Sequence, residues 1–161
     1  MNTEDLHILR GLLTESRVLS LGVLVDGRPH VGLLPFVISS DYGSALIHAS
    51  QLARHSRGLQ PGSQFSILIH AGVDDETDAL QVPRVTFSGV VHLVAHTDLD
   101  YEASRRSYIK KFPSSEKTFF LGDFNLYRLH FERGWLVAGF ARAITLGPGS
   151  LEELSRTDPA S

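Results

Sequence analysis

The chain has 161 residues, no cysteine and a formal net charge of -3, with 42% hydrophobic and 20% charged residues. This length and composition are typical of one globular domain with its own core. The absence of cysteine excludes a disulfide scaffold, a cysteine-ligated zinc or iron–sulfur site and a catalytic thiol. The slightly acidic balance disfavours electrostatic binding of nucleic acid, which needs a basic surface.

The N-terminus lacks the features of a targeting segment. It carries acids where a signal peptide has basic residues, and it is not followed by a long apolar stretch. No apolar run approaches the roughly 18–20 residues that cross a bilayer. We therefore expect no membrane partner and a cytoplasmic location.

The first part of the chain predicts a helix, a β-hairpin and a short strand. Acids after Thr3 and apolar residues at helical spacing predict a capped N-terminal helix. Two apolar runs, Val18–Val25 and His30–Ile38, flank an Asp-Gly turn and predict the hairpin. Pro35 cannot donate to a sheet ladder, so we expect an edge, a bulge or a ligand-facing gap there. Ala45–Ala49 predicts the next strand.

The middle of the chain predicts two helices and two longer strands. Gln51–Leu59 is typical of a helix that ends before a Pro-Gly stop. Strands are expected at Gln64–Ala71 and Arg84–Val94, with a solvated acidic loop at Gly72–Leu80 between them. Asp98–Lys111 begins with acids and ends with lysines, the order that a helix dipole favours.

The last predicted element is a second hairpin. Its strands, Phe124–Phe131 and Trp135–Leu146, would turn at Glu132–Gly134. We expect a single domain over residues 1–149, with residues 150–161 as a C-terminal tail that is either a short helix or frayed.

Six or seven strands without βαβ alternation predict a mainly β (α+β) fold, an antiparallel β-barrel with short helices at its rim. Val18–Val25 and Trp135–Leu146 carry apolar residues on both faces, whereas a half-buried strand alternates. One face can fill the barrel, and the other needs a cover that three short helices do not supply. The pattern therefore favours a homodimer.

Familiar catalytic and metal-binding motifs are absent from the sequence. It contains no P-loop, no dinucleotide-binding glycine motif, no HExxH zinc motif and no nucleophile elbow. His92 and His96 have the spacing of two ligands on one face of a helix, but they end a strand, where packing explains them better. We predict no metal site and assign no catalytic residue.

Residues 48–57 are the most informative stretch. A strand ends near Ala49, and Ser50 is positioned to cap the helix expected after it. Helix N-termini bind anions, and arginine can hold a phosphate through two parallel hydrogen bonds. Three donors follow within one turn: Arg54, His55 and Arg57. Two interpretations stay open, a phosphate site and a solvated basic helix face with an ordinary cap.

Five segments follow one another in a characteristic order: Val31–Val37, Ser50–Arg57, Gln64–Ile69, Arg84–Val91 and Trp135–Ala143. This series covers most of residues 4–146. It resembles the pyridoxamine 5′-phosphate oxidase-like family of FMN-binding split β-barrels, and within it the branch related to haem-utilisation proteins.

The resemblance implies a homodimer with two FMN sites at the subunit interface. Arg54 and His55 would hold the phosphate, and other residues would flank the flavin ring or approach it from neighbouring strands. The cofactor-binding residues that the resemblance implies are Leu33, Leu34, Pro35, Phe36, His48, Ala49, Ser50, Arg54, His55, Arg57, Ser66 and Arg84.

A flavin carries its own redox chemistry, and the protein supplies orientation and electrostatics. The resemblance thus implies an FMN-dependent oxidoreductase that acts on a small-molecule substrate. Two alternatives stay open. One is a non-catalytic haem- or flavin-binding module, with His7, His96 or His130 as candidate haem ligands. The other is a deazaflavin cofactor in the same barrel.

Overall fold

The computed structural model describes residues 1–139 and 142–157. Phe140 and Ala141, which belong to the last of the five segments, lie outside the described residues. So do residues 158–161 of the predicted tail.

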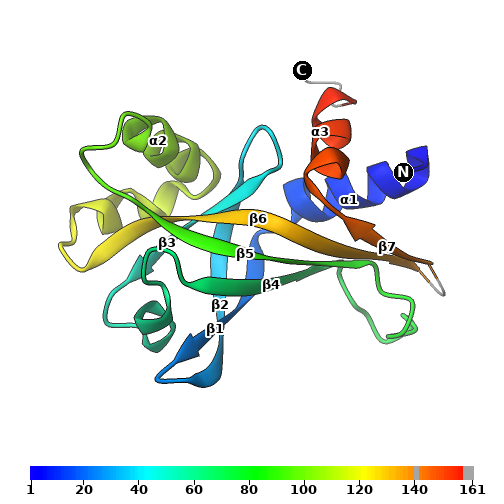
Figure 1. The fold of residues 1–161 in the computed structure, drawn as a ribbon, viewed down its shortest axis with the longest axis horizontal. Coiled ribbons are helices and arrows are strands. Elements are labelled where there is room, and N and C mark those ends of the chain that lie inside the picture. Colours follow the sequence, from blue (N-terminus) through cyan, green and yellow to red (C-terminus); the bar gives the residue numbers. More distant parts are fainter. Residues whose placement is uncertain (140–141, 158–161) are drawn as a thin grey trace.

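Seven antiparallel strands in the described part of the chain form one sheet in the order β3-β2-β1-β4-β5-β6-β7. Pairing of β3 with β6 closes six of them into a barrel, and β7 extends the sheet beyond it (Figure 1). The predicted split β-barrel is confirmed. The strands are β1 (Val18–Val25), β2 (Arg28–Ile38), β3 (Ser44–Ser50), β4 (Gln64–His70), β5 (Arg84–Val94), β6 (Phe124–Gly139) and β7 (Arg142–Leu146).

The structure describes five helices outside the barrel: α1 (Thr3–Glu15), η1 (Arg54–Gly58), α2 (Tyr101–Lys111), η2 (Pro113–Phe120) and α3 (Pro148–Arg156), of which η1 and η2 are 3-10 helices. The cap of α1 is Asn2 rather than Thr3, because Asn2 Oδ1 accepts a hydrogen bond of 2.8 Å from the Asp5 backbone N–H. None of the helices described is both long and apolar enough to cross a membrane.

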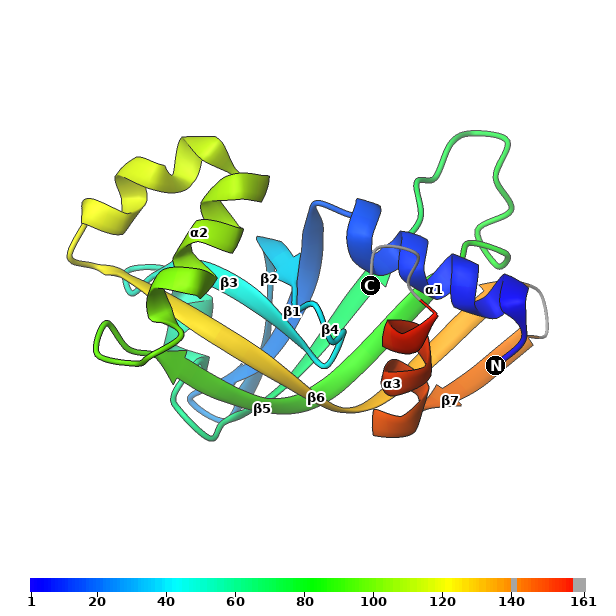
Figure 2. The ribbon, with the colours of Figure 1, turned by 90° about the horizontal axis from the view of Figure 1, so that it is seen from above.

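The C-terminal helix α3 belongs to the barrel domain. Leu151 and Leu154 are buried in the main core, and Arg10 of α1 donates to the Leu154 carbonyl at 2.9 Å. Figure 2 shows α1 and α3 together beside β6 and β7. The predicted domain boundary after residue 149 therefore falls inside a packed helix.

The first hairpin forms as predicted, and the second does not. Asp26 and Gly27 have φ angles of 52° and 72°, which are typical of the tight two-residue turn that Asp-Gly favours. The turn predicted at residues 132–134 is wrong, because β6 continues through them. The β5–β6 register shifts at Ser88 and Gly89 and leaves Glu132 without a partner, so a β-bulge occupies the place of the expected turn.

Helices α2 and η2 cover one side of the barrel. They pack on the outward side chains of β3 and of the adjoining ends of β2, β5 and β6. These side chains form a second core with the two helices: Val37, Leu46, Val94, Tyr101, Tyr108 and Leu126. We call this side of the barrel the covered wall.

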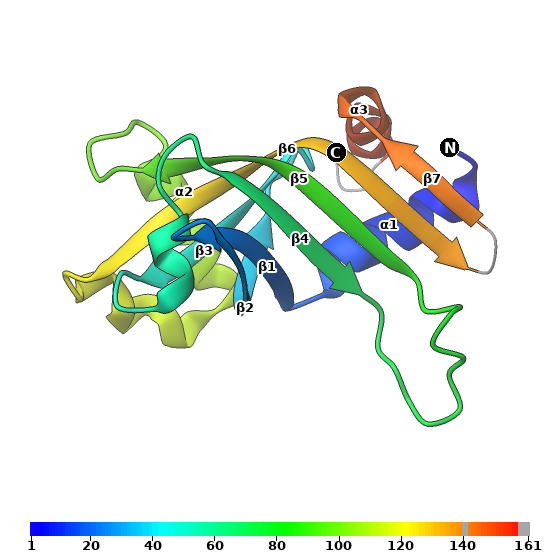
Figure 3. The ribbon, with the colours of Figure 1, turned by 60° about the horizontal axis from the view of Figure 1, so that its bottom comes forward.

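On the opposite side, formed by β1, β4, β5 and the adjoining parts of β2 and β6, none of the described helices covers the strands in this way. In Figure 3 no helix lies in front of β4 and β5. Large apolar side chains are exposed on this side: Leu24 (61%), Val31 (69%), Leu33 (68%) and Trp135 (49%). We call it the open wall. The strands predicted to carry apolar residues on both faces are present. Helices cover the outer face of the covered wall, whereas the outer face of the open wall is exposed.

Candidate functional site

The predicted cofactor-binding residues lie in three separate places outside the main core, and Leu34, Phe36 and Ala49 lie within that core. Leu33, Ser66 and Arg84 project on the open wall. The His48–Ser50 end of β3 lies beside η2, at the covered wall. The third group, residues 54–57, lies on η1 next to β1 and β2. Within one protomer the predicted residues thus do not surround a single point, and the site at a subunit interface stays a prediction.

His48 is occupied in packing on the covered wall. Its ring stacks on Phe119 with centroids 3.8 Å apart, and only 8% of the residue is exposed. Thr118 Oγ1 donates to the Ser115 carbonyl, so it accepts from His48 Nδ1 at 3.2 Å. Burial lowers the pKa of His48 to about 4, so the imidazole is neutral at pH 7.

The helix predicted at residues 51–59 is wrong. The chain forms the short 3-10 helix η1 there, and the residue before it, Ala53, makes no side-chain cap. Ser50 is instead the last residue of β3: its hydroxyl donates to Asp123 and accepts from the Leu52 backbone N–H at 3.1 Å. No α-helix N-terminus is therefore presented to an anion at Ser50.

A small basic pocket of about 240 Å³ lies at the β1–β2 turn. It is lined by Val25, Asp26, Arg28, Pro29, His30 and Arg54. Of the three predicted donors, only Arg54 lines this basic pocket. The Arg57 guanidinium instead pairs with the Asp26 carboxylate at 2.9 Å, and both side chains are largely exposed. Sequence reasoning missed Arg28 and His30. The sequence places both residues beside an Asp-Gly turn, but it does not predict that this turn lies close to η1.

The His55 ring packs against β2 and does not line the basic pocket. A Cβ atom at Gly32 would lie 2.8 Å from His55 Nδ1, so the ring approaches β2 this closely only because residue 32 is glycine. Burial, followed by the charge of the neighbouring His30, lowers the pKa of His55. Its Nε2 is buried and has no hydrogen-bond partner in the described part of the chain.

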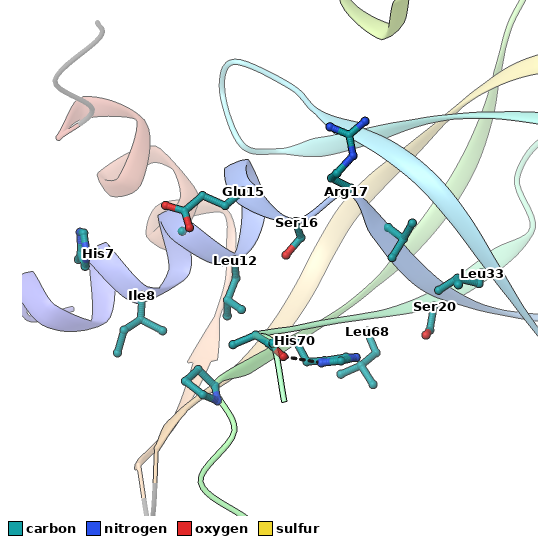
Figure 4. Close-up of a pocket in the computed structure, with 15 residues that line it drawn as sticks. His7, Ile8, Leu12, Glu15, Ser16, Arg17, Ser20, Leu33, Leu68 and His70 are labelled. Atoms are coloured by element: carbon teal, nitrogen blue, oxygen red, sulfur yellow. Dashed lines mark hydrogen bonds between the residues drawn. The ribbon is translucent and has the colours of Figure 1, made fainter. Parts of the chain in front are cut away.

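A larger groove, of about 540 Å³, runs between α1 and the open wall (Figure 4). We call it the α1 groove. Its apolar lining comes from α1 and three strands: Ile8, Leu12, Val18, Leu33 and Leu68. Binding sites for small molecules are commonly clefts of about 300–1,000 Å³ with a mainly apolar lining and a few polar groups. The α1 groove has these properties.

The polar groups of the α1 groove come from both of its sides. His7 projects from α1, and His70 projects from the end of β4, where its Nδ1 lies 2.7 Å from the Ala71 carbonyl oxygen (Figure 4). Arg17 lines the rim of the groove at the start of β1, but its guanidinium points away from His70 and lies 4.9 Å from the Phe112 ring centroid (Figure 4). The groove thus combines apolar walls with two imidazoles, the hydroxyls of Ser16 and Ser20 and the carboxylate of Glu15.

Gly11 keeps the α1 side of the groove open. A glycine inside a helix costs about 1 kcal/mol relative to alanine. A Cβ atom at Gly11 would meet only the Glu15 side chain, at 3.8 Å, so packing within the protein does not require glycine there. The missing side chain leaves room for a ligand against the helix.

The remaining histidines that the sequence singled out lie outside the α1 groove. His92 and His130 line a hollow with Asp98 and Asp100, and their ring centroids are 6.1 Å apart. His96 packs against Tyr101, with centroids 4.3 Å apart. Across residues 1–139 and 142–157, no three metal-binding side chains converge on one point.

The sequence is 33% identical over 134 residues to haem oxygenase HutZ of Vibrio cholerae, an alignment that covers 80% of this chain and 73% of that protein. The chain belongs to the HutZ-like family. It is also 30% identical over 138 residues to the chloroplastic non-canonical haem oxygenase HOZ of Arabidopsis thaliana. That alignment covers 83% of this chain but only 40% of the plant protein. No family model matches the sequence.

Solved structures place the HutZ-like fold among the split barrels. The chain superposes on a haem-binding protein from Mycobacterium smegmatis with a TM-score of 0.81 and 22% identity, covering 95% of this chain and 62% of that chain. The structure of HutZ, described as a haem storage protein, superposes with a TM-score of 0.68 and 26% identity. That superposition covers 77% of this chain and 87% of HutZ. A pyridoxinephosphate oxidase family protein from Clostridium acetobutylicum superposes with a TM-score of 0.66 and 14% identity. That superposition covers 94% of this chain and 99% of the other. The predicted relation to haem-utilisation proteins is confirmed.

Proposed function

We propose that this protein binds haem in the α1 groove. The observation that carries the proposal is the groove itself, an apolar cleft of about 540 Å³ with imidazoles at its sides. Two relatives are named as haem oxygenases, and HutZ is also described as a haem storage protein. These names describe those proteins, and the groove supplies the reason to extend haem binding to this chain.

The residues of the α1 groove fit the chemistry of haem. The macrocycle is flat and apolar and matches the leucine side chains of the groove, above all Leu33 and Leu68 on the strands. An imidazole nitrogen can ligate the iron. Bound haem would supply iron for binding oxygen or for storage, and the groove residues would bind the ring, orient it and exclude water.

We also propose that a second copy of the chain covers the open wall. The exposed side chains Leu24, Val31 and Leu33 lie on the β1–β2 hairpin, and Trp135 lies in the adjoining part of β6. Burial of apolar surface stabilises an interface by roughly 25 cal/mol per Å² before the entropic costs of association. A partner on the open wall would also close the strand side of the α1 groove.

The basic pocket supports a second candidate function. Arg28, His30 and Arg54 line a cleft of about 240 Å³, which has the charge to hold the phosphate of FMN. The protein would then be an FMN-dependent oxidoreductase, and the flavin would lie on the open wall near Ser66. Arg84, on the same wall, lies further along β5.

Titration of the purified protein with haem and, separately, with FMN tests both functions. For haem binding we expect a protein-bound Soret band that saturates at one haem per chain, whereas a spectrum identical to free haem would contradict it. For FMN binding we expect saturable quenching of flavin fluorescence. Haem bound to the protein with no response to FMN would exclude the second candidate.

A further inference from the structure

The eight histidines of the chain differ in what their rings already contact. His48 stacks on Phe119, and His55 packs against Gly32. Four others lie in the basic pocket or on the far side of the barrel: His30, His92, His96 and His130. Only His7 and His70 line the α1 groove.

His70 differs from His7 because a hydrogen bond fixes its tautomer. The Ala71 carbonyl can only accept, so His70 Nδ1 carries a proton and donates it across 2.7 Å. Nε2 then keeps its lone pair and is the atom free to ligate a metal. Histidines that ligate metals characteristically donate their other N–H to a carbonyl or carboxylate, which orients the ring. The His7 ring makes no hydrogen bond within the described part of the chain.

The position of His70 suits a ligand to a flat cofactor. It ends β4, and its backbone is held on one side by pairing with β5. Leu68, two residues earlier, projects on the same face and lies opposite Ser20 and Thr86. Arg84 lies directly opposite His70 on β5 and adds a positive charge beside it.

We propose that His70 Nε2 is the protein ligand to the iron when the α1 groove holds haem, and that the Ala71 carbonyl orients the imidazole. This inference rests on the proposed haem-binding function. Leu68 and Leu33, which line the groove, then contact the macrocycle.

The test is a haem titration of His70→Ala followed by absorption and electron paramagnetic resonance spectroscopy. We expect the wild type to show the spectrum of histidine-ligated ferric haem. The variant should lose this spectrum and bind haem at least tenfold more weakly. Added imidazole, which can occupy the space of the missing ring, should restore the spectrum. His70→Gln, which keeps a polar side chain of similar length, should behave like His70→Ala.

Matched controls separate the role of His70 from a general effect of losing an imidazole. His96→Ala and His130→Ala, both outside the groove, should keep the wild-type spectrum and affinity. A wild-type spectrum in His70→Ala, or its loss in His7→Ala alone, would overturn the assignment while leaving haem binding intact. A wild type that shows no protein-bound haem would overturn the proposed function itself.

Discussion

Along the single strand β2, the chain passes from the open wall to the covered wall. Val31 and Leu33 are 69% and 68% exposed, whereas Val37, further along the strand, is 7% exposed because it lies in the second core beneath the helices α2 and η2. Valine and leucine side chains on the outer face of one strand are thus exposed or buried according to whether α2 and η2 cover them. An apolar outer face left uncovered on one wall is available to bind something else.

The two walls also treat histidine differently. His48 on the covered wall is buried, hydrogen-bonded to Thr118 and neutral at pH 7. His70 on the open wall has a fixed tautomer and a free Nε2 beside a groove. The covered wall thus uses its imidazole for stability, and the open wall keeps one available for a ligand.

Acid should destabilise the covered wall through His48. Its pKa is lowered to about 4 in the folded protein, so below its ordinary value of 6.5 the unfolded state binds the proton more readily. The stabilisation is complete above pH 6.5 and is lost as the pH falls towards 4, by about 3 kcal/mol in total.

Urea denaturation of the wild type and of His48→Phe between pH 7 and pH 4 measures this effect. Phenylalanine can stack on Phe119 but cannot titrate, so the variant should lose that part of the pH dependence. His92→Phe, a matched change at an exposed position, should retain it. Parallel pH profiles for the wild type and His48→Phe would contradict the assignment.

A charge on the open wall should break the proposed dimer. Trp135→Asp places a carboxylate among apolar side chains that a partner would bury, and we expect the dimer to dissociate at least 100-fold more readily. Sedimentation equilibrium measures the change. Lys117→Asp, on the exposed surface of η2, should leave the association unchanged. A wild type that is monomeric at all concentrations would refute the dimer.

The strands were the most predictable part of this molecule, because each is a local run of apolar residues. β1 matches its predicted bounds of Val18–Val25, with an Asp-Gly turn directly after it. The failures occur where turn-forming or helix-forming residues are overridden by tertiary pairing. Glu132–Gly134 would make a turn in isolation, but ladders with β5 and β7 hold this part of β6 extended. The chain after Ser50 forms only a short 3-10 helix.

The site was less predictable than the fold, because its parts come from distant segments. The α1 groove brings His7 together with His70, and no local pattern relates the two positions. Leu33 and Arg84 were expected near a cofactor and do project on the open wall, since strand alternation can be read from sequence. The sequence does not reveal which wall the helices cover, because the packing of α2 and η2 depends on tertiary contacts.

Filling the α1 groove should weaken haem binding on the open wall. Gly11→Leu extends a side chain into the space beside the helix, and we expect at least a tenfold loss of haem affinity without loss of stability, because leucine favours the helix. Absorption titration and thermal unfolding measure the two quantities. Thr14→Leu, on an exposed part of α1 outside the groove, is the matched control. Unchanged haem affinity in Gly11→Leu would place the ligand elsewhere.

The basic pocket allows a test that leaves both walls intact. Arg54→Ala removes one charge-assisted contact to a phosphate, and we expect about tenfold weaker FMN binding and unchanged haem binding. Arg106→Ala, on the exposed surface of α2, removes the same charge and should alter neither. Equal FMN affinity in both variants would show that the phosphate does not bind at Arg54.

The smallest expected effect concerns the acid in the basic pocket. Asp26 pairs with Arg57 at 2.9 Å, and both side chains are largely exposed, so their ion pair contributes less than about 1 kcal/mol to stability. Asp26→Asn removes the one carboxylate that faces an incoming phosphate and frees Arg57. FMN affinity should therefore rise two- to threefold at low salt, and the gain should fade at high salt because exposed charges are screened. A fluorescence titration at two ionic strengths measures it, and a fall in affinity would mean that Asp26 orients the arginines rather than repelling the ligand.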